Sequence, residues 1–150
     1  MLINGYAIIF DELFEITQYK GMRFYEVVRR GALDGVDLNN VILTRKHDLD
    51  GYIYAISPDN LYLTVDSVGL RFECELDNNE NGKKLYREIE QGFLNACSCM
   101  FNLNKKVDSE FYNKATRTRY INRINKFFEV CVSSKEAVVY KNTYVEIGGI

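Results

Sequence analysis

Short stretches in which apolar and polar residues alternate, each ended by a turn, recur along this chain and restrict it to a strand-rich fold. The clearest pair covers 61–65 and 70–76, and a turn at 66–69 separates them. Such alternation is typical of strands that bury one face. Together with the stretch 52–56, these strands predict an antiparallel meander.

The rest of the chain predicts more strands and one helix. Further strands are expected at 2–10, 23–28, 41–45, 96–103, 119–132 and 137–140. The helix is expected between Asp77 and Gly92, because Leu85 and Ile89 are four apart on one face and glycine suits a helix end. The polar segment 104–118 is expected to be irregular. These elements predict a mainly β fold, a closed or nearly closed antiparallel β-barrel with peripheral helices, one of which precedes the strand 96–103.

Length and composition predict a single domain over residues 1–150 that buries its own core. The net charge of −2 gives no reason to expect nucleic acid as the main partner. No apolar run approaches the roughly 20 residues that a membrane span requires, and the N-terminus lacks the pattern of a signal peptide. We therefore expect a cytosolic protein with no membrane partner.

The four cysteines, Cys74, Cys97, Cys99 and Cys131, form no C-x-x-C pair and have no histidine at metal-ligand spacing. We expect reduced thiols that act as small apolar residues, and neither a metal nor a cofactor. A catalytic thiol at Cys97 or Cys99 is the minority interpretation, since it would compete with a serine for the only histidine.

That histidine, His47, closes the expected strand at 41–45, and Ser98 lies in the later strand among small residues. Serine is a poor nucleophile until a base takes its proton, so this pair is what a serine hydrolase requires. Alternation along the strand places Ser98 on one face with Ala96 and Met100, away from Cys97 and Cys99. One face is then expected to be core and the other a groove.

Six segments, in order, resemble the prohead serine proteases of tailed phages, which are related to the herpesvirus assemblin protease. The matching segments are Gly5–Phe10, Glu26–Leu33, Lys46–Asp48, Gly69–Leu76, the serine strand Ala96–Phe101, and Phe128–Ser133. The resemblance covers roughly residues 5–140. It implies an assemblin-like barrel with Ser98 as the nucleophile, His47 as the general base and Glu129 as the third member.

The third position has alternatives in the sequence. Glu129 stands in an otherwise apolar strand, where an unpaired buried carboxylate would cost several kcal/mol, and this favours a partner for it. An outward-facing Glu129 is the other interpretation, and Asp48 is a weaker candidate. An oxyanion hole is also required. Arg117, Arg119 and Arg123 are expected to belong to a solvated basic loop, and the alternative is that one of the three helps position a water or a backbone donor.

The resemblance further implies cleavage of the major capsid protein and its scaffold segment inside the immature capsid, in the host cytoplasm, with self-cleavage. It also implies a homo-oligomer, as a dimer. Two positions depart from the family pattern: Met100 stands where a glycine is usual, and Lys46 where an asparagine is usual. They motivate the alternative function, a catalytically degraded capsid-assembly module.

Overall fold

Three four-stranded sheets and one helix make up the part of the chain that the computed structural model describes, residues 1–105 and 108–149. The first sheet has the order β12-β1-β7-β6, with β1 (Leu2–Ile9), β6 (Leu61–Val65), β7 (Gly69–Glu75) and β12 (Tyr144–Ile147). The second has the order β2-β3-β10-β9, with β2 (Phe14–Tyr19), β3 (Met22–Val28), β9 (Glu110–Asn113) and β10 (Thr118–Ile121). The third has the order β5-β4-β11-β8, with β4 (Ile42–Arg45), β5 (Ala55–Ile56), β8 (Ala96–Asn102) and β11 (Lys126–Ser133). The helix is α1 (Glu80–Glu90).

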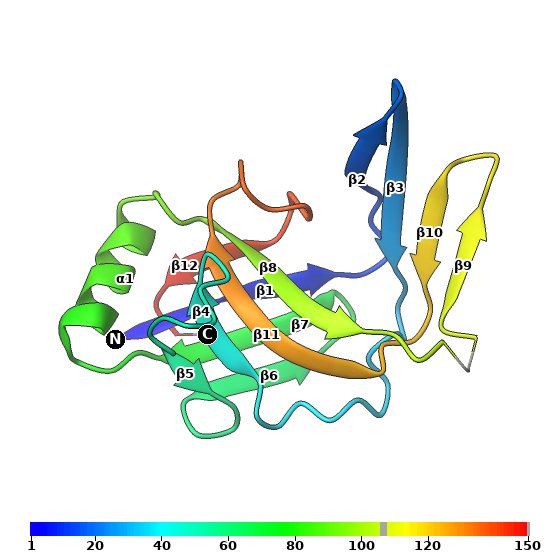
Figure 1. Ribbon diagram of the computed structural model, residues 1–150. Helices are drawn as coiled ribbons and strands as arrows, with labels where there is room; N and C mark the ends of the chain where they lie inside the picture. The colour runs from blue at the N-terminus through cyan, green and yellow to red at the C-terminus, as the bar shows by residue number, and fades with distance from the viewer. Residues whose placement is uncertain (106–107, 150) are drawn as a thin grey trace.

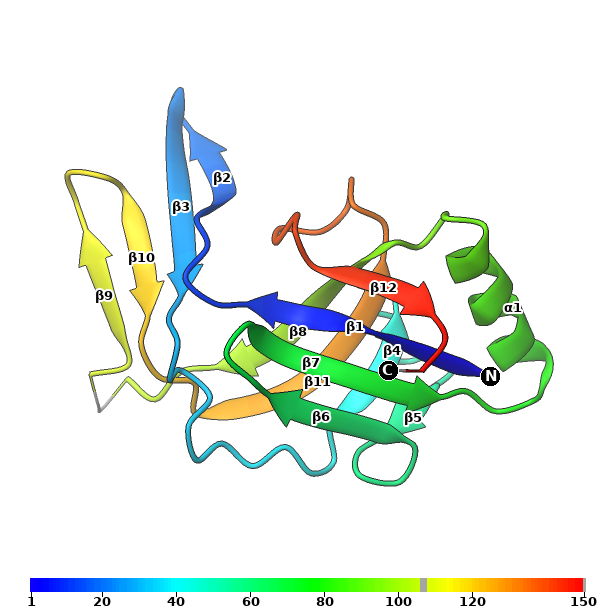
Figure 2. The same cartoon turned by 180° about the vertical axis from the view of Figure 1, so that it is seen from behind.

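The first and third sheets form the body of the molecule, and the second projects from it (Figure 1). Seen from behind, the same four strands again stand away from the body, and α1 lies at the opposite end beside the N-terminus (Figure 2). The body buries the largest apolar side chains, among them Ile3, Leu43, Phe72, Leu85 and Phe127. Both sheets of the body contribute to this core, which therefore fixes their relative position.

The mainly β class predicted from the sequence is confirmed, and the pairing differs from an antiparallel barrel in two respects. None of the three sheets closes on itself through paired strands in the described ranges, so the closed barrel stays a prediction. Two pairs, β3 with β10 and β4 with β11, are parallel. The partners in each parallel pair are far apart in sequence, which leaves room for the long connection that parallel pairing requires.

Several predicted strands have different bounds in the structure. The long strand expected at 119–132 is two strands in two sheets, because the chain crosses from the projecting sheet to the body at 122–125. The stretch 52–56 contributes only β5, which pairs with β4, so the meander reduces to the hairpin of β6 and β7. The segment 104–118, expected to be irregular, contains β9; residues 106–107 lie outside the described ranges.

The last predicted strand, 137–140, is wrong. This segment forms a turn and loop, and the final strand is β12. Two of the apolar residues that suggested a strand, Val138 and Tyr140, are buried because they pack inward from the loop. The centroid of the Tyr140 ring lies 4.8 Å from that of Phe14.

The predicted helix is confirmed. Asn79 caps its first turn, with the side-chain oxygen accepting a hydrogen bond from the Gly82 N–H at 2.9 Å. Gly92 follows its end with φ 79°, a conformation that glycine adopts without steric cost. No helix in the described ranges is long and apolar enough to cross a bilayer.

Candidate active site

The candidate site is built across β11, which pairs with β4 on one side and with β8 on the other. Cys131 of β11 lies opposite Thr44 of β4 and opposite Ser98 of β8. Residues opposite each other in a sheet project from the same face, as does the residue two positions along the strand. Glu129 therefore shares this face, and the pairing gathers side chains that are distant in sequence.

His47 reaches the same face through a tight reversal after β4. Lys46 and His47 have φ of 53° and 58°, the left-handed region that costs a non-glycine residue roughly 1–2 kcal/mol. Two backbone hydrogen bonds hold this reversal: Lys46 N–H donates to the Val132 carbonyl at 2.9 Å, and His47 N–H donates to Cys131 Sγ at 3.0 Å. These two bonds fix the backbone of His47, from which the imidazole extends to this face.

Four side chains then form one continuous row of contacts. Ser98 Oγ lies 2.9 Å from His47 Nε2, and His47 Nδ1 contacts Glu129 Oε1. The Thr44 hydroxyl donates to Glu129 Oε2 at 2.7 Å. A carboxylate only accepts hydrogen bonds, so Nδ1 carries the imidazole proton and Nε2 is left free to accept from the Ser98 hydroxyl. This is the protonation state in which a histidine can act as a base toward serine.

Burial differs along this row in a way that suits its chemistry. Glu129 and Thr44 are fully buried, whereas the His47 side chain is 40% exposed and Ser98 is half-buried. The buried carboxylate is satisfied at both oxygens, as a buried charge must be. The outward-facing alternative for Glu129 is therefore wrong, and the partner of Nδ1 is Glu129 rather than the exposed Asp48.

The strand that delivers His47 is anchored to the helix. Arg45, the last residue of β4, donates from Nε to Glu88 Oε2 at 2.8 Å and from Nη2 to Oε1 at 2.6 Å. Both side chains are mostly buried, and this bidentate pair lowers the pKa of Glu88 below its ordinary value. The pair joins α1 to the start of the reversal at Lys46.

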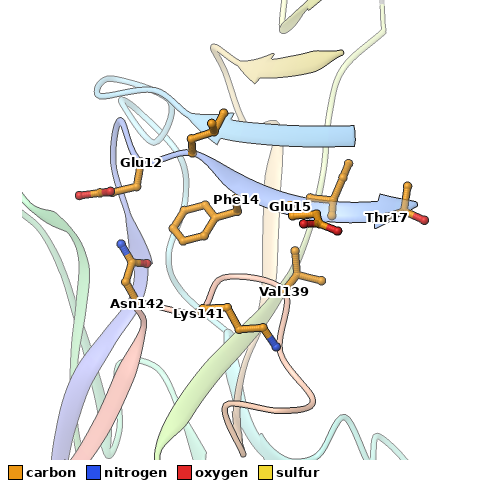
Figure 3. Close-up of a pocket in the computed structure, with 9 residues that line it drawn as sticks. Glu12, Phe14, Glu15, Thr17, Val139, Lys141 and Asn142 are labelled. Carbon is orange, nitrogen blue, oxygen red and sulfur yellow. The ribbon is translucent and has the colours of Figure 1, made fainter. Parts of the chain in front are cut away.

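A hollow of about 360 Å³ opens directly beside Ser98. Its lining includes Met100 and Phe101 of β8, Ile16 of β2, and Val139. A second, larger hollow of about 650 Å³ shares Ile16 and Val139 with it and continues along β2. Figure 3 shows this larger hollow, with Phe14 on the β2 side facing the loop that carries Val139. The two hollows together extend away from the serine.

Among the strands that the structure describes, β8 is the outer one of its sheet, and no described strand pairs with its other backbone edge beside Ser98. At Cys97 that edge is occupied by the Thr143 hydroxyl, which accepts from the Cys97 N–H at 3.0 Å and donates to its carbonyl at 2.7 Å. By the two-residue period of a strand, the backbone groups of Cys99 point to the same outer edge. Cys99 is also one of the residues that line the smaller hollow.

The structure separates the three arginine candidates. Arg119 lines the hollow with Ser98, where Glu26 and Glu110 hold its guanidinium. Arg117 instead donates to the Arg23 carbonyl at 2.9 Å. Arg123 is exposed and lines a different hollow.

The two cysteines beside Ser98 are unsuited to nucleophilic chemistry. Cys97 is fully buried and burial raises its pKa well above the ordinary value. Burial, with the nearby carboxylates of Glu26 and Glu129, also raises the pKa of Cys99. Both thiols therefore stay protonated near neutral pH, and the contact of His47 Nε2 is with the Ser98 hydroxyl.

Two residues of the site gave no sequence signal: Thr44, which holds the carboxylate, and Cys131, whose sulfur accepts the His47 N–H. In the sequence, both look like ordinary strand residues. Only the pairing of β11 with β4 brings them next to Glu129 and His47. Within residues 1–105 and 108–149, no group of three or more histidine, cysteine or acidic side chains is arranged to hold a metal ion.

Comparison with known proteins gives one family match. The model of the caudovirus prohead serine protease family matches residues 1–148. None of the curated proteins and none of the solved structures matches the chain.

Proposed function

Because the chain belongs to the caudovirus prohead serine protease family, we propose that it is an endopeptidase with Ser98 as nucleophile, His47 as general base and Glu129 as the residue that orients the imidazole. Membership of the family implies serine peptidase activity and a role in capsid maturation. The observation that carries the residue assignment is the continuous contact from Ser98 through His47 to a fully buried Glu129.

In the proposed reaction, Ser98 Oγ attacks the carbonyl carbon of the scissile peptide bond as its proton passes to His47 Nε2. The imidazolium that forms is stabilised by Glu129, whose second oxygen remains held by Thr44. His47 then gives the proton to the leaving amine, and the C–N bond breaks to leave an acyl-enzyme. Water repeats the sequence, so that a carboxylic acid is released and the Ser98 hydroxyl is restored.

A peptide substrate suits the surroundings of Ser98. Beyond Cys97, where Thr143 occupies it, the outer edge of β8 can pair with an extended chain, as sheet edges do in peptide recognition. The hollows along β2 extend the same region, which gives room for several residues on one side of the scissile bond. We take the substrate to be the major capsid protein with its scaffold segment, cleaved inside the immature capsid in the host cytoplasm. Self-cleavage and a homodimer are part of this proposal.

The two departures from the family pattern leave the row of contacts in place. Lys46 adopts the left-handed conformation that the reversal needs, and the Met100 side chain is 40% exposed beside Ser98. Nothing in the site favours the degraded assembly module over the protease.

The test is co-expression with the major capsid protein of the same phage, with mass spectrometry of the N-terminus of that capsid protein. We expect truncation with the wild-type chain and with Ser134→Ala, a half-buried serine that lines neither hollow, and no truncation with Ser98→Ala. An intact capsid protein in all three, with the chain folded, would support the assembly module. Truncation that persists with Ser98→Ala would refute the proposed nucleophile.

A further inference from the structure

The hollow beside Ser98 is lined mainly by apolar side chains, and its lining also includes one ion pair, Glu26–Arg119. Its walls come from β8, from the loop at Val139 and from Ile16, which occupies a β-bulge where the register of β2 against β3 shifts between Glu15 and Thr17. Bulges redirect a side chain, and they are common next to active sites. The apolar walls therefore stand directly beside the proposed nucleophile.

The ion pair in the lining has its hydrogen-bonding groups satisfied within the protein. Glu26 of β3 is buried, with 5% of its surface exposed; its Oε2 accepts from Arg119 Nε at 2.9 Å and lies 2.8 Å from Nη2 in an ion pair. Its Oε1 accepts from the Tyr140 hydroxyl. Burial, followed by the charge of Glu26, raises the pKa of Tyr140, so this hydroxyl remains a donor. Both carboxylate oxygens are thus occupied by groups of the protein itself.

Next to this ion pair, the hollow disfavours a substrate side chain that carries a charge of either sign. A basic side chain would meet the guanidinium of Arg119 and find the oxygens of Glu26 already taken. An acidic side chain would meet the buried carboxylate of Glu26, which already offsets the charge of that guanidinium. An uncharged apolar side chain would lose least on entering, because it only replaces water against apolar walls.

We infer, on the basis of the proposed protease function, that this hollow binds the substrate side chain flanking the scissile bond and that the pair Glu26–Arg119 restricts it to uncharged apolar residues. Glu26 is then a specificity-determining residue. Its negative charge offsets that of Arg119, which would otherwise attract acidic side chains.

The decisive variant is Glu26→Gln. Glutamine keeps the shape of glutamate, its oxygen can accept from Arg119 and its amide can donate to Tyr140, yet the charge of Arg119 is then offset only by the half-exposed Glu110. The matched control is Glu110→Gln, since Glu110 contacts the same guanidinium at 3.3 Å but has a side chain that is 45% exposed and screened by solvent.

The measurement is kcat/KM on junction peptides of the capsid protein that carry Leu, Glu or Lys at each position flanking the scissile bond. For the wild type we expect at least a tenfold preference for Leu over both charged residues at one of these positions. Glu26→Gln should reduce the discrimination against Glu at least tenfold and leave that against Lys in place, and Glu110→Gln should change it less than threefold. An unchanged Leu-to-Glu ratio in a folded Glu26→Gln chain would overturn the inference.

A second variant and a binding measurement keep the test independent of folding and of catalysis. Ile16→Trp should fill the hollow and lower kcat/KM for the Leu peptide at least tenfold more than for a Gly peptide, whereas Met22→Trp on the same hairpin should not. Peptide binding to the Ser98→Ala chain reports the pocket without turnover. If the Ser98→Ala chain binds the Leu peptide selectively but the wild type cleaves no peptide, the protease function is refuted and the apolar pocket is supported. If the wild type cleaves all the peptides without preference, only the inferred specificity of the pocket is refuted.

Discussion

Replacing Glu129 with glutamine removes the only charge from the buried end of the row while leaving its shape intact. The wild-type carboxylate has no exposed surface and contacts His47 Nδ1 with one oxygen and the Thr44 hydroxyl with the other. Because a carboxylate can only accept, it fixes the proton of the imidazole on Nδ1. A glutamine can present either its oxygen or its NH₂ group to Nδ1, and the two orientations have different consequences.

If the amide oxygen faces Nδ1, the tautomer survives and only the charge-assisted hydrogen bond to the imidazolium is lost. That loss is about 1.5–3 kcal/mol, or roughly 10- to 150-fold in kcat. If the NH₂ group faces Nδ1, the proton moves to Nε2, which can no longer accept from Ser98, and the loss approaches ~10⁴-fold. We therefore expect kcat for Glu129→Gln to fall by a factor between about 10 and 10⁴.

Stability should respond differently from activity. Burying a charge costs free energy that a buried amide does not require, so Glu129→Gln is expected to melt at the same temperature as the wild type or higher. The assay is kcat on a junction peptide together with a thermal melt followed by circular dichroism. Glu146→Gln, an exposed glutamate on β12, is the control and should change neither. A change in kcat of less than about threefold for Glu129→Gln would refute the role of Glu129 in the row.

Three further results are expected. Lys46→Asn should raise the free energy of unfolding by up to about 1 kcal/mol in a denaturant titration, because asparagine tolerates the left-handed φ of 53° better than lysine; an unchanged or lower value would contradict this. Iodoacetamide near neutral pH should leave activity intact, since burial raises the pKa of Cys99; inactivation that keeps pace with alkylation would revive the cysteine hydrolase. Arg45→Gln should cost about 1 kcal/mol of stability at neutral pH. The partner carboxyl has a lowered pKa in the folded state, so this difference should vanish as the pH falls through that pKa; a difference that persists in acid would show that the ion pair with Glu88 is not its source.

The sequence predicted those elements whose side chains alternate between core and solvent. β7 and α1 bury a periodic set of residues, and β6 turns Leu61 and Leu63 inward; the positions of all three elements were expected correctly. β2 and β9 were missed because they bury almost nothing beyond Phe14, so their side chains carry no periodic signal. They are strands because each pairs its backbone with the next strand along the chain, β2 with β3 and β9 with β10, and this backbone pairing leaves no periodic pattern in the side chains.

The site shows the same division. His47 and Ser98 stood out by residue type, and Glu129 came from the family resemblance, because an acidic residue in an apolar strand does not reveal its partner. Thr44 joins them only because β4 lies parallel to β11, in a register that sequence periodicity does not specify. The role of Glu26 was hidden for the same reason, since its partner Arg119 comes from another strand far along the chain.

The central claim is that His47 activates Ser98, and covalent labelling tests it most directly. A fluorophosphonate reagent reacts with serines whose proton a base removes, and peptide mapping by mass spectrometry then locates the adduct. We expect a single adduct on the peptide that contains Ser98, with none in Ser98→Ala and slower labelling in Glu129→Gln. A folded chain that takes no adduct, or takes it at another serine, would show that His47 does not activate Ser98.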